Sequence, residues 1–176
     1  EAITRRGNAE KDPSVQDTAK QTTEMLNEAR ETLATPDRIA TLSGSDLAAD
    51  RLLAAQLLGG EGVVADVHLL LPLLLQDGDL EVRRCALAAV GRTDSPELWQ
   101  VAMEHLSVPA FCNAAVAALA AVGEKLLPAL DAFFARPSQR PATMVRIVRI
   151  YGLIGGDQAL ALLIDKINFP EKRVRD

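Results

Sequence analysis

Apolar residues recur along the chain in blocks that each end at a glycine, and the blocks are 32 residues apart. The clearest sign is the hexapeptide ALAAVG, which occupies positions 86–91 and again positions 118–123. Small or aliphatic residues fill the same columns before all four block ends, which are Gly59, Gly91, Gly123 and Gly155. A fixed period of this length indicates a repeat protein in which each unit is one supersecondary element.

Each unit has the pattern of two helices. The block before a glycine places apolar residues at helical spacing, as Val82, Ala86 and Val90 do. The glycine then suits the helix end, where a left-handed backbone conformation costs it little. A second helix is expected after each glycine, over residues 63–76, 96–106, 124–135 and 157–167. No strand is expected, so the predicted fold is all-α, an α-solenoid of stacked antiparallel helix pairs.

The repeated alanines predict close packing between units. A single helix pair cannot bury its apolar face alone, and stacked pairs form one continuous core. Alanine lets neighbouring helices approach closely, so we interpret ALAAVG as a packing motif rather than a functional one.

The chain divides into three segments by pattern. Residues 1–15 are polar and are expected to form a flexible tail. Residues 16–44 are expected to form capping or connector helices, one over 16–33 with a single apolar face and a short one from 36 to 42. Residues 45–176 hold about four repeat units. A helix that caps the first unit and a connector from an upstream domain both fit the segment 16–44.

One unit resembles a known family. The stretch LLPLLLQDGDLEVRRCALAAVG, residues 70–91, resembles a HEAT repeat of the short bacterial type through Asp77, Val82, Arg83 and Gly91. In that family the turn aspartate and the arginine six residues later help to build a ladder of polar contacts between repeats. Only Asp77 and Arg83 match this pairing, so the resemblance implies stacking that rests mainly on apolar contacts.

The end of the chain repeats the start of a glycine-ended helix, because Val174 and Arg175 match Val82 and Arg83. We therefore expect a piece of a longer protein, truncated as a further unit begins.

Composition narrows the class of protein. Hydrophobic residues make up 48% of the chain but aromatic residues only 3%, which favours helices rich in alanine and leucine. The net charge of −5 argues against general nucleic-acid binding, which depends on neutralising phosphates. The longest apolar runs are far shorter than the roughly 20 residues of a membrane span. With only two cysteines and no disulfide framework, a cytoplasmic location is expected.

No residue pattern nominates an active site. His68 and His105 lack carboxylates or cysteines at ligand spacing, and Cys85 and Cys112 have no nearby base. The glycine-rich stretch LGGEG, residues 58–62, lacks the lysine and hydroxyl of a phosphate-binding loop. We therefore expect no catalytic residue, no metal and no cofactor.

Charge is distributed unevenly along the chain. Residues 136–176 hold eight Lys and Arg against four Asp and Glu, a net charge of +4, whereas residues 1–135 carry −9. The candidate partner-binding residues are Arg84, Arg140, Arg146 and Arg149. The pattern favours a solvated face whose arginines pair with carboxylates of the same chain. The functional alternative is a patch that binds an acidic protein or peptide partner, a phosphate group or an anionic lipid headgroup.

These patterns favour a non-catalytic interaction or scaffold module, a cytosolic domain of a larger protein. Short HEAT arrays of this kind resemble the cytosolic tails of some bacterial transporters. The alternative is an enzyme or enzyme-assisting protein that resembles the HEAT-repeat bilin lyases. It predicts a groove centred on His68, His105 or Cys112. A HEAT-type DNA-repair protein is disfavoured, because the chain is acidic and has one Trp and one Tyr.

Overall fold

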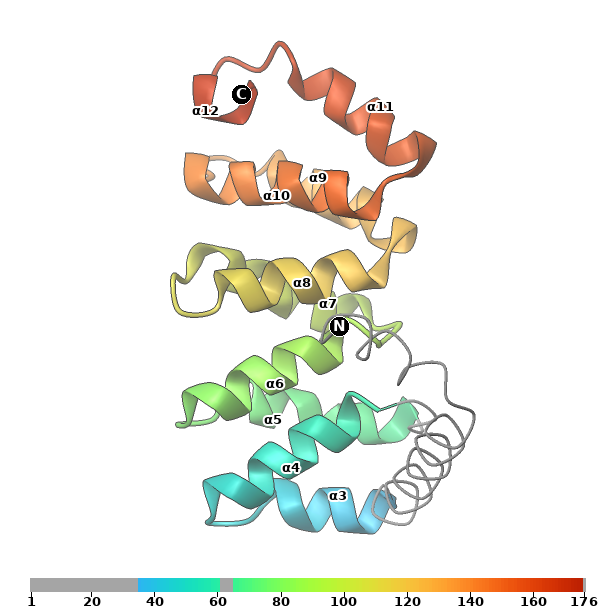
Figure 1. The fold of residues 1–176 in the computed structure, drawn as a ribbon, viewed down its shortest axis with the longest axis vertical. Coiled ribbons are helices and arrows are strands. Elements are labelled where there is room, and N and C mark those ends of the chain that lie inside the picture. The colour runs from blue at the N-terminus through green and yellow to red at the C-terminus, as the bar shows by residue number, and fades with distance from the viewer. Residues whose placement is uncertain (1–34, 61–64, 176) are drawn as a thin grey trace, which may run out of the picture.

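A computed structural model describes residues 35–60 and 65–175 of the chain. This part contains ten α-helices and no strand, as the sequence predicts. Helices that follow one another in sequence pack on one another, so the elements form a stack from α3 at one end to α12 at the other (Figure 1). The expected helix over 16–33 and the tail before it lie outside the described residues.

The four glycine-ended helices form one row of the stack. Each is followed directly by its glycine, and α4 packs on α6, α6 on α8 and α8 on α10 (Figure 1). The 32-residue period therefore places these helix ends correctly. The four helices are α4 (Ala48–Leu58), α6 (Leu80–Val90), α8 (Cys112–Val122) and α10 (Pro141–Ile154).

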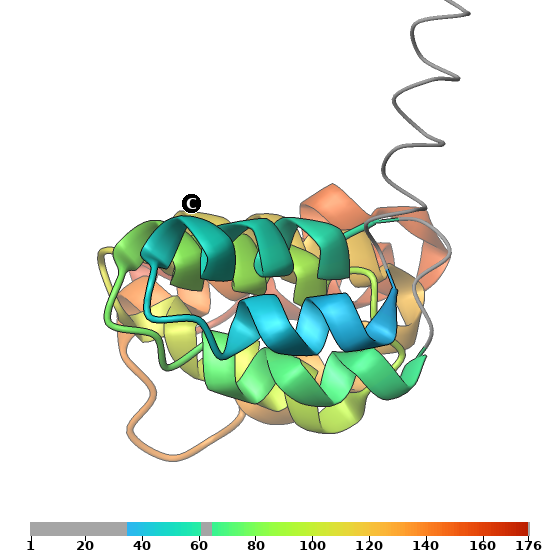
Figure 2. The ribbon, with the colours of Figure 1, turned by 90° about the horizontal axis from the view of Figure 1, so that it is seen from below.

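Among the six remaining helices, α5, α7 and α9 lie behind this row (Figure 1), and Figure 2 shows the stack from its end. The helix α3 packs on α4 and confirms the short helix expected from residue 36. The last element, α12, packs on α10. These helices are α3 (Pro36–Ser43), α5 (Leu71–Leu74), α7 (Pro96–Glu104), α9 (Leu127–Phe134), α11 (Gly156–Lys166) and α12 (Lys172–Arg175).

Two of the second helices are shorter than the sequence predicts. The helix expected over 63–76 is a 3₁₀ segment, Ala65–Leu70, followed by the single turn α5. The helix expected over 124–135 likewise starts with a 3₁₀ turn, Glu124–Leu126, before α9. Pro72 and Pro128 explain both, because proline donates no N–H and its ring clashes with the carbonyl four residues earlier. Each proline therefore lies in the first turn of its α-helix.

The two ALAAVG copies touch each other. A methyl group on Gly91, the end of the first copy, would lie 2.6 Å from the carbonyl oxygen of Ala118 in the second. Both Ala86 and Ala118 are buried. The glycine is therefore needed at this position for close approach between α6 and α8.

The four glycines do not share one backbone conformation, which corrects the sequence prediction. Gly123 and Gly155 have φ of 79° and 69°, the left-handed region expected at a helix end. Gly59 and Gly91 have φ of −81° and −61°. At position 91 glycine is required by the lack of space beside Ala118 and not by the backbone angle.

A polar contact joins the first two units, but it is not the pair expected from the resemblance. Asp77 accepts two hydrogen bonds from Arg51, at 2.6 Å from Nε and 3.1 Å from Nη2, and Arg51 Nη1 also donates to the carbonyl of Ser45 at 2.8 Å. Arg83 instead lies over the ring of Phe111 at 4.6 Å, and its buried Nε has no hydrogen-bond partner within residues 35–60 and 65–175. In the next unit, Pro109 occupies the position equivalent to Asp77 and offers no carboxylate. Arg83 therefore contacts the aromatic ring of Phe111 instead.

Arg175 repeats part of the geometry of Arg51. Its Nη1 donates to the carbonyls of Phe169 and Pro170, six and five residues earlier, at 3.0 and 3.2 Å. Arg51 Nη1 likewise binds the carbonyls six and five residues before it. The start of α12 thus resembles the start of α4 in its side-chain contacts.

Candidate interaction surfaces

Two of the four candidate arginines are occupied within the protein. Arg84 forms an ion pair with Glu81 on the same helix, and its Nε lies 3.5 Å from the carbonyl of Ala110. Arg146 is half-buried and donates to the carbonyl of Leu106 at 2.9 Å. For these two residues the interpretation of contacts within the chain fits better than a free binding role.

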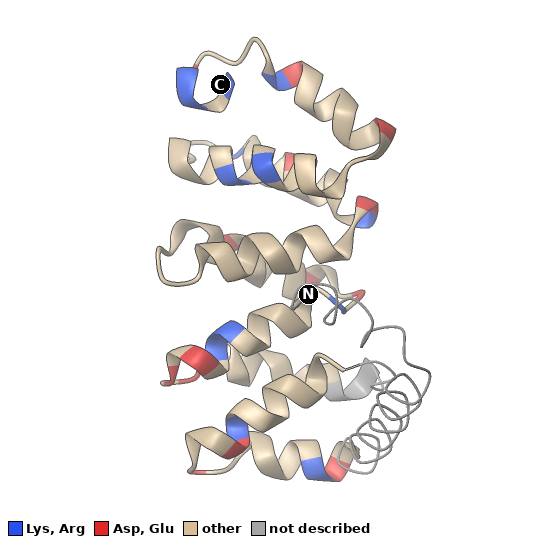
Figure 3. Ribbon diagram, in the orientation of Figure 1, with Lys and Arg blue, Asp and Glu red and all other residues tan. Residues whose placement is uncertain are grey.

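The other two candidates are exposed. Arg140 precedes α10 and Arg149 lies within it, and neither side chain forms a hydrogen bond or ion pair within the described residues. The packed helix α12 adds exposed cations, and neither α10 nor α12 contains a carboxylate (Figure 3). We call Arg149, Lys172 and Arg173 together the basic surface.

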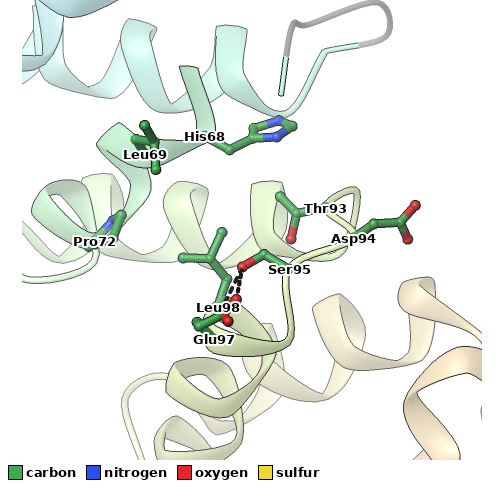
Figure 4. Close-up of a pocket in the computed structure, with 8 residues that line it drawn as sticks. All are labelled: His68, Leu69, Pro72, Thr93, Asp94, Ser95, Glu97 and Leu98. Atoms are coloured by element: carbon green, nitrogen blue, oxygen red, sulfur yellow. Dashed lines mark hydrogen bonds between the residues drawn. The ribbon is translucent and has the colours of Figure 1, made fainter. Parts of the chain in front are cut away.

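A pocket that the sequence did not indicate lies between α5 and α7 (Figure 4). Its volume is about 370 Å³, which is within the range of pockets that bind small ligands or side chains. Only His68 among its residues was a candidate in the sequence. The lining consists of His68, Leu69, Pro72, Thr93, Asp94, Ser95, Glu97 and Leu98.

The loop before α7 is held firmly against the fold. Ser95 caps the helix by accepting from the N–H of Leu98 at 3.4 Å, and it donates to Glu97 at 2.9 Å. Hydrogen bonds from its own backbone N–H and from Ser95 lower the pKa of Glu97. The buried Thr93 donates to the carbonyl of Val90 at 2.9 Å, and its own carbonyl accepts from Trp99 Nε1 at 2.9 Å. The carboxylate of Glu97 is therefore ionised and presented by a rigid segment.

The remaining histidine and the cysteines lie outside this pocket. His105 Nδ1 is 2.8 Å from the carbonyl of Val101, and its ring packs edge-on against Phe111. Cys112 is buried and donates to the carbonyl of Pro109 at 3.4 Å. Burial raises the pKa of the Cys85 thiol, which disfavours the nucleophilic thiolate. The candidates of the enzymatic alternative do not share one pocket, and within residues 35–60 and 65–175 no three His, Cys, Asp or Glu side chains are grouped to hold a metal ion.

A polar cluster around the buried Tyr151 joins α9, α10 and α11, and the sequence did not indicate it. The hydroxyl of Tyr151, fully buried, donates to Asp131 at 3.2 Å. Lys166 Nζ lies 3.2 Å from the same carboxylate and 2.8 Å from Asp165, and above the ring of Phe134. Burial, with help from the Asp131 charge, raises the pKa of Tyr151 far above its ordinary value. The residues satisfy one another, which is typical of a structural contact.

No protein family model, curated protein or solved structure matches this chain. In the part that the structure describes, no helix is long and apolar enough to cross a bilayer.

Proposed function

We propose that this chain is a HEAT-like α-solenoid that serves as a protein-interaction module and binds an acidic segment of a partner on the basic surface. The observation that carries the proposal is the set of exposed cations on α10 and α12, two packed helices without a carboxylate. Support for the repeat architecture comes from the row of four glycine-ended helices and from the shared contacts of Arg51 and Arg175.

The exposed positions of these cations favour a role in recognising a partner over a role in stabilising the fold. A single exposed ion pair contributes little, because water screens it and both side chains lose freedom. Several exposed cations on two packed helices attract an acidic partner together and suppress binding of basic ones. Binding on the basic surface should therefore weaken as the salt concentration rises.

The double substitution Arg149→Glu with Arg173→Glu tests the proposal. Both side chains are exposed, and neither forms a hydrogen bond within the described residues, so the fold should be retained. We expect affinity for a short fluorescein-labelled polyglutamate peptide, measured by fluorescence anisotropy, to fall about tenfold or more. Arg146 is left unchanged because it holds the carbonyl of Leu106.

The matched control is Arg38→Glu with Arg92→Glu. These arginines are also exposed, and the pair changes the net charge by the same amount, but they lie on α3 and after α6. The control should bind the peptide as the unchanged chain does. Equal losses in the two double variants would mean that the peptide responds to net charge alone, and the proposed surface would be rejected.

A further inference from the structure

The pocket between α5 and α7 exposes apolar side chains that the packing of the stack does not use. Leu69 is 80% exposed at its edge, and Leu73, one helical turn later, is 58% exposed. Pro72 and the buried Leu98 form the adjoining wall (Figure 4). A leucine held this far into solvent beside an open pocket indicates a surface that another apolar group can cover.

The polar groups at the pocket have one sign of charge. Asp94 and Glu97 line it, and no lysine or arginine does among the residues that the structure describes. Ser95 and Thr93 have partners within the fold. Asp94 is bound to Lys125 at 2.8 Å, but both side chains are largely exposed and this pair is easily exchanged. The pocket therefore offers carboxylate acceptors next to an apolar wall.

We propose that this pocket binds a basic amphipathic helix of a protein partner. An aliphatic side chain of that helix packs against Leu69, Pro72 and Leu98, and a lysine or arginine one turn away pairs with Asp94 or Glu97. The pairing follows from charge complementarity, since the pocket lies in the portion of the chain that carries a net charge of −9. The mode is that of a helix seated in a groove by a few apolar anchors. It is independent of the basic surface, which takes a partner of the opposite charge.

The test uses the full chain and a fluorescein-labelled helical peptide with leucine on one face and lysine on the other. Asp94→Asn with Glu97→Gln removes the charges and keeps the shapes, and should weaken peptide binding by about tenfold or more in anisotropy titrations. Leu69→Ser should weaken it by a similar factor, and its exposure means that the fold should be retained. Unchanged thermal melting by circular dichroism checks the fold of each variant.

A control pair of neutralised carboxylates tests whether the loss of affinity is specific to the pocket. Asp37→Asn with Asp157→Asn removes two exposed charges on α3 and α11, outside the pocket, and should leave the affinity unchanged. A peptide with glutamate in place of lysine should not bind at this pocket.

Three results would overturn the proposal. Equal losses of peptide affinity in the pocket double variant and in the control double variant would show that the basic peptide is attracted to the acidic chain in general. If Leu69→Ser bound the peptide with unchanged affinity, Leu69 would not be an apolar anchor for the peptide. A chain that is dimeric by light scattering, and becomes monomeric when Asp94 and Glu97 are neutralised, would assign the pocket to a second copy. The double variant Arg149→Glu with Arg173→Glu should bind this peptide normally, so failure of one surface is separable from failure of the other.

Discussion

Replacement of Gly91 by alanine is expected to lower the free energy of unfolding by about 2–3 kcal/mol. The added methyl would lie 2.6 Å from the carbonyl oxygen of Ala118 and 3.1 Å from its Cα. These are backbone atoms of the neighbouring helix, which cannot rotate away as a flexible side chain does, so α6 and α8 must separate. Urea denaturation monitored by circular dichroism measures the change.

Gly152→Ala is the matched control for this substitution. Gly152 is exposed inside α10, and a methyl there meets no atom within 4 Å. Because alanine is the better helix former, this variant should be unchanged or more stable by about 0.5–1 kcal/mol. If the two glycine variants had similar stabilities, the close approach of α6 and α8 at Gly91 would be wrong.

The glycines show what the period can and cannot predict. Constant spacing located all four helix ends, because a repeat places the same element at the same offset. It could not distinguish the two reasons for glycine: a positive φ at Gly123 and Gly155, and a neighbouring backbone at Gly91. The second reason depends on how far apart two helices lie, which is a property of the assembled stack.

The same limit applies to the polar residues. The resemblance singled out Asp77 and Arg83 for the polar contacts between repeats, but the carboxylate of Asp77 is bound by Arg51 of the preceding unit. Likewise Arg146, a candidate for partner binding, is held by a carbonyl 40 residues earlier. The pocket was missed because Leu69 and Glu97 come from different units, and their proximity follows from stacking. A chemical signal was present only in the cluster of Asp94, Ser95, Pro96 and Glu97 at the start of α7.

The contact between Arg51 and Asp77 should make stability depend on pH in a defined direction. Two parallel hydrogen bonds join the guanidinium and the carboxylate, and the Asp77 side chain is only 6% exposed. Hydrogen bonding from Arg51, supported by the backbone N–H of Asp79, lowers the pKa of Asp77 in the folded protein. An unfolded aspartate has a pKa of about 3.9. The folded state therefore favours the ionised form, and the stabilisation is present above about pH 4 and is lost as the pH falls through the folded pKa.

Asp77→Asn should accordingly lower Tm by a few degrees at pH 7 and make a much smaller difference at an acidic pH below the lowered pKa of the native aspartate. Arg51→Gln should behave in the same way, and the double variant should be little worse than either single variant, because each removes one member of the same pair. Thermal melts of the four proteins at both pH values measure this. A difference between the unchanged chain and Asp77→Asn that grows toward low pH would contradict the lowered pKa. Additive losses in the double variant would mean that the two side chains stabilise the stack separately, and the first two units would then be joined by apolar packing alone.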